Sequence, residues 1–246
     1  MSATEAPPLR ARLLAPSGLR AEVRRRVGAV LPAAAHERLR IALFRARWGF
    51  PPPPAWSDWS SYERFMALAE RHGLHTVPGD VVEIGVLLGG GTYKLCHWFA
   101  RHAPDKRVVA VDIFDPSFDP TRCTDGRTMA GLYREALAGR DQRAVFDEVT
   151  ASCTNLTVIA GDSAAVELPC ERIAFAYVDG NHSAPYVRSD FELIWERVSP
   201  GGVVAFDDYG GNLPEVTRTL HGLIGEHAGE IARVWVGGPT LLLERA

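Results

Sequence analysis

Three aspartates occupy two similar settings in the chain, each at the end of an apolar run. Asp179 follows the run 173–178, and Asp207 and Asp208 follow the run 202–206. Both runs are typical of buried strands in a parallel sheet, because they are almost continuously apolar. If the strands are neighbours, about 4.8 Å apart, the three carboxylates converge at the carboxyl edge of the sheet. Clustered carboxylates repel one another unless they take up protons or share a cation, so the sequence predicts a divalent-cation site, most simply for Mg2+.

A glycine-rich segment, EIGVLLGGGT (residues 83–92), joins the first expected strand to its helix. Glycines there let a ligand approach the backbone closely. A dinucleotide loop needs G-x-G-x-x-G, but here the spacing is Gly85-x-x-x-Gly89, with Leu87 in the place of the middle glycine. The anionic Glu83 suits a cationic ligand better than a diphosphate. We therefore expect Glu83, Gly85 and Gly89 to hold the amino-acid end of S-adenosylmethionine.

Acidic residues also end the second and third expected strands. Asp112 is placed to accept hydrogen bonds from both hydroxyls of a ribose. Asp162 is placed to accept from the amino group of an adenine, with Ser163 beside it. Each acid alone would be an ordinary loop residue. Acids after five successive strands, all at one edge, instead indicate a shared site for a nucleotide-like cofactor.

The order of elements predicts an α/β fold. Strands and helices alternate through most of the chain, and the last two strands are joined by the short link GGP (237–239), which requires an antiparallel hairpin. We expect a Rossmann-like sheet of mostly parallel strands with helices on both faces. The expected strands are residues 81–86, 107–113, 156–160, 173–178 and 203–206, followed by 231–236 and 240–244 in the hairpin.

A four-proline break at residues 51–54 divides the chain into a basic helical extension, 1–55, and a main domain, 56–246. The extension holds ten Arg and three Glu, a net charge of +7, while the whole chain carries −3. A basic arm can bind nucleic acid or dock on the acidic body of its own oligomer. Its apolar residues lie at helical spacing and favour docking in a homo-oligomer: Val23, Val27, Val30, Leu31, Leu39, Leu43 and Phe44.

Residues 115–154 form a long connection between two strands, with an expected helix at 127–138. This segment is either a lid or substrate wall over the carboxyl edge, or an ordinary crossover with a surface loop. Both readings stay open.

Composition excludes several classes. No apolar run approaches the roughly 20 residues of a membrane span, and the start lacks the apolar core of a secretory signal. The four cysteines are far apart and fit neither a zinc site nor a disulfide framework. We expect reduced thiols in a cytoplasmic protein.

Two segments resemble a known family. Residues 77–86 (VPGDVVEIGV) with the following glycines, and residues 193–210 with the motifs SPGG and DDYG, resemble the macrocin-type sugar O-methyltransferases. The resemblance covers residues 77–245. It implies a class I methyltransferase that uses S-adenosylmethionine, usually with Mg2+, to methylate a hydroxyl of a natural-product sugar, as in antibiotic biosynthesis. It also implies that Asp179, Asp207 and Asp208 form the metal triad.

The chain departs from the family's pattern after the fourth strand. The family usually has Asp-Gly-Asp-x-Tyr, whose second Asp is a candidate base, whereas this chain has DGNHS (179–183), with Asn181 in that place. His182 follows the expected metal ligand Asp179 by three residues, and its near-neutral pKa suits a general base. The alternative is a loop histidine that hydrogen-bonds the backbone.

Other functions remain to be separated from a sugar O-methyltransferase. The acceptor could be a catechol-like hydroxyl. A nucleic-acid methyltransferase often carries a Pro-Pro-aromatic run after the fourth strand to hold a flipped base, and DGNHS is not such a run. A nucleotide-binding oxidoreductase is disfavoured by the glycine spacing. A binding protein without catalysis is the remaining alternative.

Overall fold

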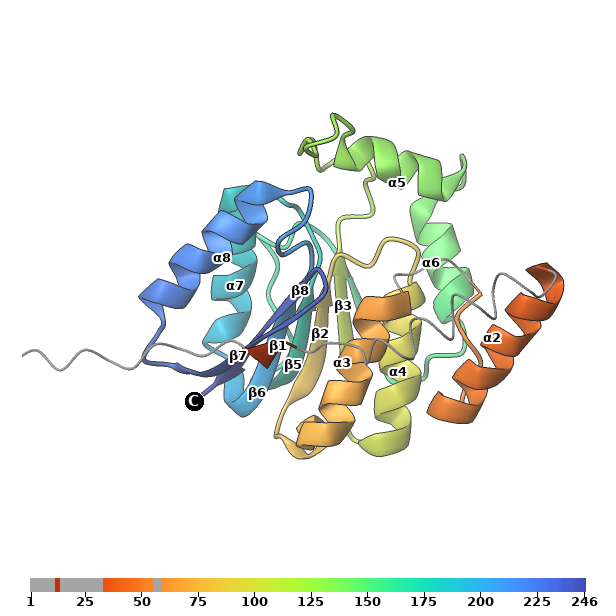
Figure 1. The fold of residues 1–246 in the computed structure, drawn as a ribbon, viewed down its shortest axis with the longest axis horizontal. Coiled ribbons are helices and arrows are strands. Elements are labelled where there is room, and N and C mark those ends of the chain that lie inside the picture. Colours follow the sequence, from red (N-terminus) through yellow and green to blue (C-terminus); the bar gives the residue numbers. More distant parts are fainter. Residues whose placement is uncertain (1–11, 14–32, 55–58) are drawn as a thin grey trace, which may run out of the picture.

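The computed structural model describes residues 12–13, 33–54 and 59–246. Within these residues one eight-stranded sheet forms, in the order β1-β7-β8-β6-β5-β2-β3-β4 (Figure 1). Five neighbouring strands from β6 to β4 are parallel, and β8 runs antiparallel to both β6 and β7. The expected parallel sheet with a closing hairpin is confirmed. The strands are β1 Arg12–Leu13, β2 Asp80–Ile84, β3 Val108–Asp112, β4 Leu156–Ala160, β5 Ile173–Val178, β6 Val198–Phe206, β7 Ile231–Gly237 and β8 Thr240–Arg245.

Helices cover both faces of the sheet, as expected, with α3 and α4 on one face and α7 and α8 on the other (Figure 1). Alternate strand residues point to opposite faces, so each face has its own core. On β5, Phe175 and Tyr177 enter the core under α3 and α4, whereas Ala176 and Val178 enter the core under α7 and α8. The helices are α2 Ala33–Trp48, α3 Trp59–His72, α4 Gly90–His102, α5 Met129–Leu137, α6 Gln142–Thr150, α7 Ala184–Trp195 and α8 Pro214–Glu226, with a 3-10 turn at Leu74–Thr76.

Some element boundaries differ from the sequence prediction. Strand β6 begins at Val198, five residues before the expected start, because SPGG continues the strand through an irregularity in its pairing with β5. Helix α6 was not predicted. It begins at an N-cap, Asp141, whose side chain accepts a hydrogen bond from the amide of Ala144.

The end of the amino-terminal extension packs on the main domain. Phe44, Trp48 and Phe50 are buried, and the Phe50 ring stacks on the His97 ring of α4 with centroids 5.3 Å apart. Leu43, in contrast, is 60% exposed. The expected apolar positions 23–31 lie outside the described residues, so docking onto another subunit stays a prediction.

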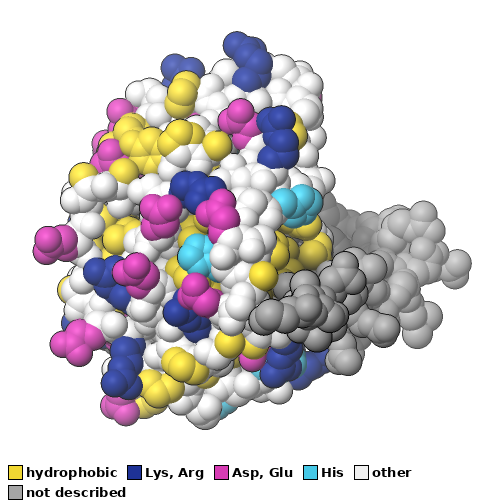
Figure 2. Space-filling model, turned by 90° about the vertical axis from the view of Figure 1, so that its left-hand side faces the viewer, with side chains coloured by type: hydrophobic (Ala, Val, Ile, Leu, Met, Phe, Trp, Pro, Cys, Tyr) yellow, Lys and Arg dark blue, Asp and Glu magenta, His cyan; other side chains and the backbone are white. Residues whose placement is uncertain are grey.

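Three general features bear on function. All four cysteines are free. No described helix is long and apolar enough to cross a bilayer. Among the described residues on the face in Figure 2, acidic and basic side chains are interspersed, without the single-sign stripe typical of a nucleic-acid footprint.

Candidate active site

A cavity of about 630 Å3 lies at the carboxyl edge of the parallel strands. The chain leaves β2 toward β3 and β4 on one side, while β5 and β6 lie on the other, so the order of strands switches direction between β2 and β5. Open α/β sheets bind ligands at such a switch point. The loops after all five parallel strands line the cavity, together with residues from the 115–154 segment.

Gly85 brings the loop after β2 against the loop after β5. Its φ is +82°, and a Cβ there would lie only 2.0 Å from the carbonyl oxygen of Asp179. The amide of Asp179 donates to the carbonyl of Ile84 at 2.8 Å. Gly85 is therefore required both by its backbone conformation and by close packing, and it lines the cavity as predicted.

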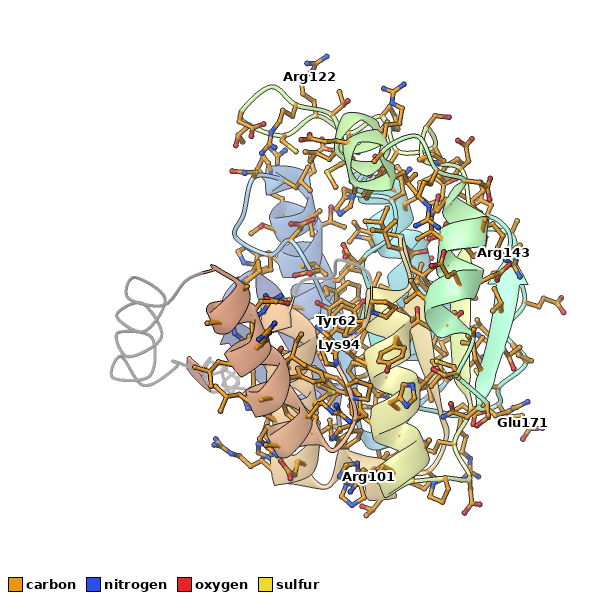
Figure 3. All side chains as sticks on the ribbon, turned by 90° about the vertical axis from the view of Figure 1, so that its right-hand side faces the viewer. Tyr62, Lys94, Arg101, Arg122, Arg143 and Glu171 are labelled. Atoms are coloured by element: carbon orange, nitrogen blue, oxygen red, sulfur yellow. The ribbon has the colours of Figure 1, made fainter. Side chains whose placement is uncertain are left out.

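Glu83 lies beneath the glycine loop and does not line the cavity. Its two carboxylate oxygens accept from the hydroxyls of Tyr62, at 2.6 Å, and Thr92, at 2.5 Å. Burial raises the pKa of Glu83 to about 7 against the effect of these two donors. Tyr62 does line the cavity, and it lies beside Lys94 between α3 and α4 (Figure 3). The sequence predicted that Glu83 contacts the cofactor directly. In the structure the hydroxyl of Tyr62, from α3, lies between the Glu83 carboxylate and the cavity.

Gly89 also lies outside the cavity lining. It is the N-cap of α4 with a φ of +78°, and a Cβ there would lie 2.9 Å from the Phe146 ring of α6. The structural requirement for this glycine is the close approach of α6, a helix that the sequence did not reveal.

Asp112 ends β3 at the cavity, as expected. Its Oδ2 accepts from the amides of Val86 and Leu87, and its Oδ1 accepts from the amide of Phe114 and the side chain of Gln142. Burial raises the pKa of Asp112 despite these four donors. The carboxylate therefore fixes the backbone of the glycine loop, in addition to the predicted ribose contact.

Asp162 and Ser163 lie in the loop after β4 and line the far end of the cavity. The carboxylate of Asp162 accepts from the amide of Ala164 at 2.9 Å and from the hydroxyl of Tyr186 at 3.0 Å. These bonds hold the loop next to Asp112, on the side of the cavity away from β6.

Two of the three expected metal ligands come together, and His182 joins them. Donor atoms of Asp179, His182 and Asp208 all lie within 4.8 Å of one another. The Nε2 atom of His182 is 2.9 Å from Oδ2 of Asp208 and 3.5 Å from Oδ1 of Asp179. Asp208 has a φ of +58°, a left-handed conformation that Asp adopts more readily than most residues other than Gly.

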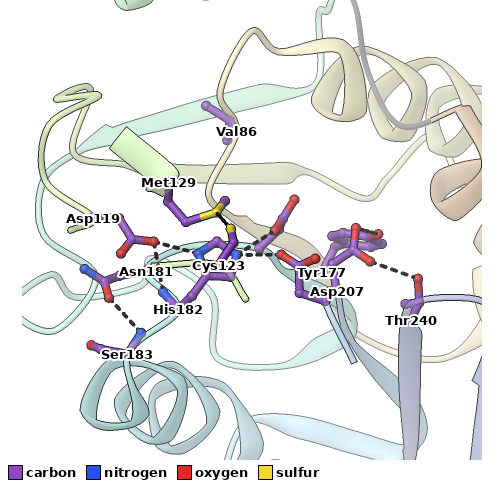
Figure 4. Close-up of polar contacts among 12 residues, drawn as sticks. Val86, Asp119, Cys123, Met129, Tyr177, Asn181, His182, Ser183, Asp207 and Thr240 are labelled. Atoms are coloured by element: carbon purple, nitrogen blue, oxygen red, sulfur yellow. Dashed lines mark hydrogen bonds and ion pairs between the residues drawn. The ribbon is translucent and has the colours of Figure 1, made fainter. Parts of the chain in front are cut away.

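His182 is held by an aspartate that the sequence did not single out. Asp119 is 3% exposed, and its Oδ2 accepts from Nδ1 of His182 at 2.6 Å and from the amide of His182 at 3.2 Å (Figure 4). Burial would lower the pKa of His182, but the hydrogen bond to Asp119 and the facing Asp179 and Asp208 outweigh it and raise the pKa well above its usual value. The hydrogen bonds that Asp119 accepts from His182 and Thr121 lower the pKa of Asp119, although burial alone would raise it.

Asp207 lies apart from this group. Its Oδ2 accepts from the hydroxyl of Tyr177 at 3.0 Å and its Oδ1 from the hydroxyl of Thr240 at 3.2 Å (Figure 4). Burial, with the nearby charges of Asp179 and Asp208, raises the pKa of Asp207. The chain has left β6 at this point, and the turn made by the φ of +58° at Asp208 separates the two consecutive carboxylates.

The family model with the description "Methyltransferase domain" matches residues 82–209, just over half of the chain. The chain belongs to this methyltransferase family. The match includes the glycine loop, Asp112, the cluster of Asp179, His182 and Asp208, and the 115–154 segment between β3 and β4. A comparison with curated protein sequences gave no match.

Solved structures agree on the fold of this methyltransferase. The O-methyltransferase NovP has a TM-score of 0.59 and 20% sequence identity, over 76% of this chain and 80% of that chain. CalS11, a calicheamicin methyltransferase, has a TM-score of 0.56 and 18% identity, over 99% of both chains. The resemblance to natural-product sugar methyltransferases is thus confirmed for the fold.

Proposed function

We propose that this methyltransferase transfers the methyl group of S-adenosylmethionine to a hydroxyl of a small molecule, most simply a sugar of a bacterial natural product. The observation that carries the proposal is one cavity that joins the glycine loop to Asp179 and Asp208, two members of the cluster that they form with His182. The sugar acceptor is supported by similarity to CalS11, which is described as a TDP-rhamnose 3'-O-methyltransferase in a second structure with a TM-score of 0.53.

The lining of the cavity supports one direction for the cofactor. Its adenosine would lie toward Asp112, Asp162 and Ser163, and its amino-acid end toward Gly85 and the hydroxyl of Tyr62. The sulfonium would then lie between these two ends, near the contact of Gly85 with Asp179. In this direction the methyl group would face the side of the cavity that Asp179 and Asp208 line.

The remaining wall supports a small acceptor with both apolar and polar parts. Met129, Leu132 and Tyr133 of α5 line the cavity, with Arg127 and Glu135 from the same segment. We propose that residues 115–154 act as the substrate wall. The wall holds the acceptor oxygen in line with the methyl group and keeps water from the reacting atoms.

The acceptor hydroxyl must lose a proton during transfer. A divalent cation held by Asp179 and Asp208 would lower the pKa of that hydroxyl and fix its position. The predicted role of His182 as general base requires Nε2 to reach the hydroxyl. His182 is 4% exposed and does not line the cavity, because the two carboxylates lie between. A base role therefore requires these carboxylates to move aside.

The test is release of S-adenosylhomocysteine from a panel of sugar-bearing metabolites and simple catechols, with and without EDTA. We expect turnover of a sugar hydroxyl, loss in EDTA, and recovery with divalent metal. Full activity in EDTA would leave His182 as the base without a metal. Binding of NAD in place of S-adenosylmethionine in calorimetry, or no turnover of any hydroxyl, would contradict the proposed function.

A further inference from the structure

The donor set at the end of the cavity does not suit Mg2+. Mg2+ prefers an octahedron of oxygen atoms, several of them from water. Here two carboxylates and one imidazole nitrogen converge. A neutral imidazole is a ligand typical of first-row transition metals such as Fe2+, Ni2+ and Zn2+.

The imidazole nitrogen is prepared as a donor. Asp119 accepts a hydrogen bond from Nδ1 of His182, which keeps one ring proton on Nδ1, so Nε2, which faces Asp179 and Asp208, is the nitrogen that a metal ion would bind in place of a proton. Nε2 is buried and has no hydrogen-bond partner of acceptable geometry, although Oδ2 of Asp208 lies 2.9 Å away. Three electron-pair donors facing one point require a cation or a proton between them.

The spacing of the donors suits a small metal ion. Nε2 lies 2.9 and 3.5 Å from the two carboxylate oxygens. Metal–nitrogen and metal–oxygen bonds of about 2.1 Å place neighbouring ligand atoms about 3.0 to 3.4 Å apart in octahedral or tetrahedral geometry. The side chains therefore need only small shifts to share an ion.

The oxygen-only alternative is disfavoured by the contacts of Asp207. Its two oxygens accept from the hydroxyls of Tyr177 and Thr240, on two other strands. To join Asp179 and Asp208, Asp207 would have to give up at least one of these two bonds in a largely buried environment.

Resting on the divalent cation of the proposed function, we infer that the metal is a first-row transition-metal ion held by Asp179, Asp208 and Nε2 of His182. Asp119 is a positioning residue, which fixes the tautomer and orientation of the His182 ring. A carboxylate in this position raises the basicity of a ligating histidine. It also ties the ligand to the wall segment, because Asp119 lies at the start of that wall.

The test uses the full-length protein, stripped of metal. Calorimetry gives the affinities for Co2+ and Mg2+, and pulsed EPR of bound Mn2+ detects coupling to the imidazole nitrogen. We expect a Co2+ affinity well above that for Mg2+, and a nitrogen coupling. His182→Gln should lower the ratio of the two affinities at least tenfold and abolish the coupling. Asp119→Asn should weaken Co2+ binding about 10- to 100-fold.

Asp207→Asn is the matched control for Asp208→Asn, because it removes the charge of the residue next to the proposed ligand by the same Asp-to-Asn change. It should keep both the affinity ratio and the nitrogen coupling. The inference would be overturned if His182→Gln left the ratio of the Co2+ and Mg2+ affinities unchanged. It would also be overturned if Asp207→Asn lost as much metal affinity as Asp208→Asn. The absence of any metal binding would overturn the inference as well, in which case His182 carries a proton between the carboxylates. Affinity for S-adenosylmethionine, measured on each variant, reports separately on folding and on the proposed function.

Discussion

Replacing Gly85 with alanine should separate the cofactor loop from the loop that carries Asp179. The added Cβ would lie 2.0 Å from the carbonyl oxygen of Asp179, and real Cβ contacts essentially never fall under 3.0 Å. The two loops must therefore move apart by about 1 Å or more, and the contact atoms are backbone, which cannot rotate away.

The cost has two parts. The φ of +82° in alanine costs about 1–2 kcal/mol, and the clash adds to it. Gly139→Ala is the matched control, since Gly139 has a φ of +81° and nothing within 4 Å of its added Cβ. We expect the control to lower the melting temperature by roughly 2–8 °C and Gly85→Ala to lower it further. A displacement of about 1 Å at the reacting groups can also cost about 100-fold in rate.

Thermal melts, calorimetry with S-adenosylmethionine and single-turnover methyl transfer on both variants measure these effects. Gly85→Ala should lose activity about 100-fold and bind cofactor more weakly, while Gly139→Ala keeps both. If the two variants melt alike and transfer methyl groups alike, the close contact of the two loops is not what the site needs.

Three other perturbations follow from the same site. Burial raises the pKa of Glu83 from 4.5 to about 7, so between these values the folded protein holds a proton that the unfolded chain has released. The contribution of Glu83 to stability should therefore fall by about 3 kcal/mol as pH rises from 4.5 to 7, in addition to the falls from Asp190 and Asp207, whose pKa values burial also raises. In melts across pH, Glu83→Gln should remove about this share of the slope. Asp112→Ala should weaken S-adenosylmethionine binding tenfold or more by calorimetry, through lost hydrogen bonds to the ribose and the glycine loop; unchanged affinity would refute the assignment. Removing residues 1–50 should lower the melting temperature, because Trp48 and Phe50 are buried on the main domain. If the extension joins subunits, the removal should also change the mass measured by light scattering. Loss of salt-sensitive DNA or RNA binding alone would favour a nucleic-acid role instead.

The fold was largely predictable from local patterns. Continuous apolar runs marked the buried parallel strands, and GGP marked the hairpin of β7 and β8. Helix α6 escaped because it spans only nine residues inside a long connection, too few for its apolar spacing to stand out, and only the cap at Asp141 signals its start. The early part of β6 escaped because SPGG reads as a turn, although pairing with β5 carries the strand through it.

The site was predictable where strand ends determine position, and less so where side-chain direction matters. Asp112 and Asp179 follow from the ends of their strands. The separation of Asp207 from Asp208 depends on a φ of +58° at Asp208, which no spacing reveals. Asp119 meets His182 across 63 residues of chain, and only the path of the wall segment brings them together. The role of each residue in catalysis stays a prediction.

The wall segment, residues 115–154, is anchored at two points to groups that other parts of the chain position. Near its start, Asp119 accepts from His182, and at the first residue of α6, Gln142 donates to Asp112 and to the carbonyl of Leu87. The residues between these anchors supply α5 and its cavity-lining side chains. Within the stretch 120–141, Cys123, Met129 and Leu137 belong to the core, whereas Leu132, Tyr133 and Glu135 line the cavity. We therefore expect exchanges at these lining positions to change which acceptor is recognised, while the two anchors keep the reacting centre and the cofactor loop in place.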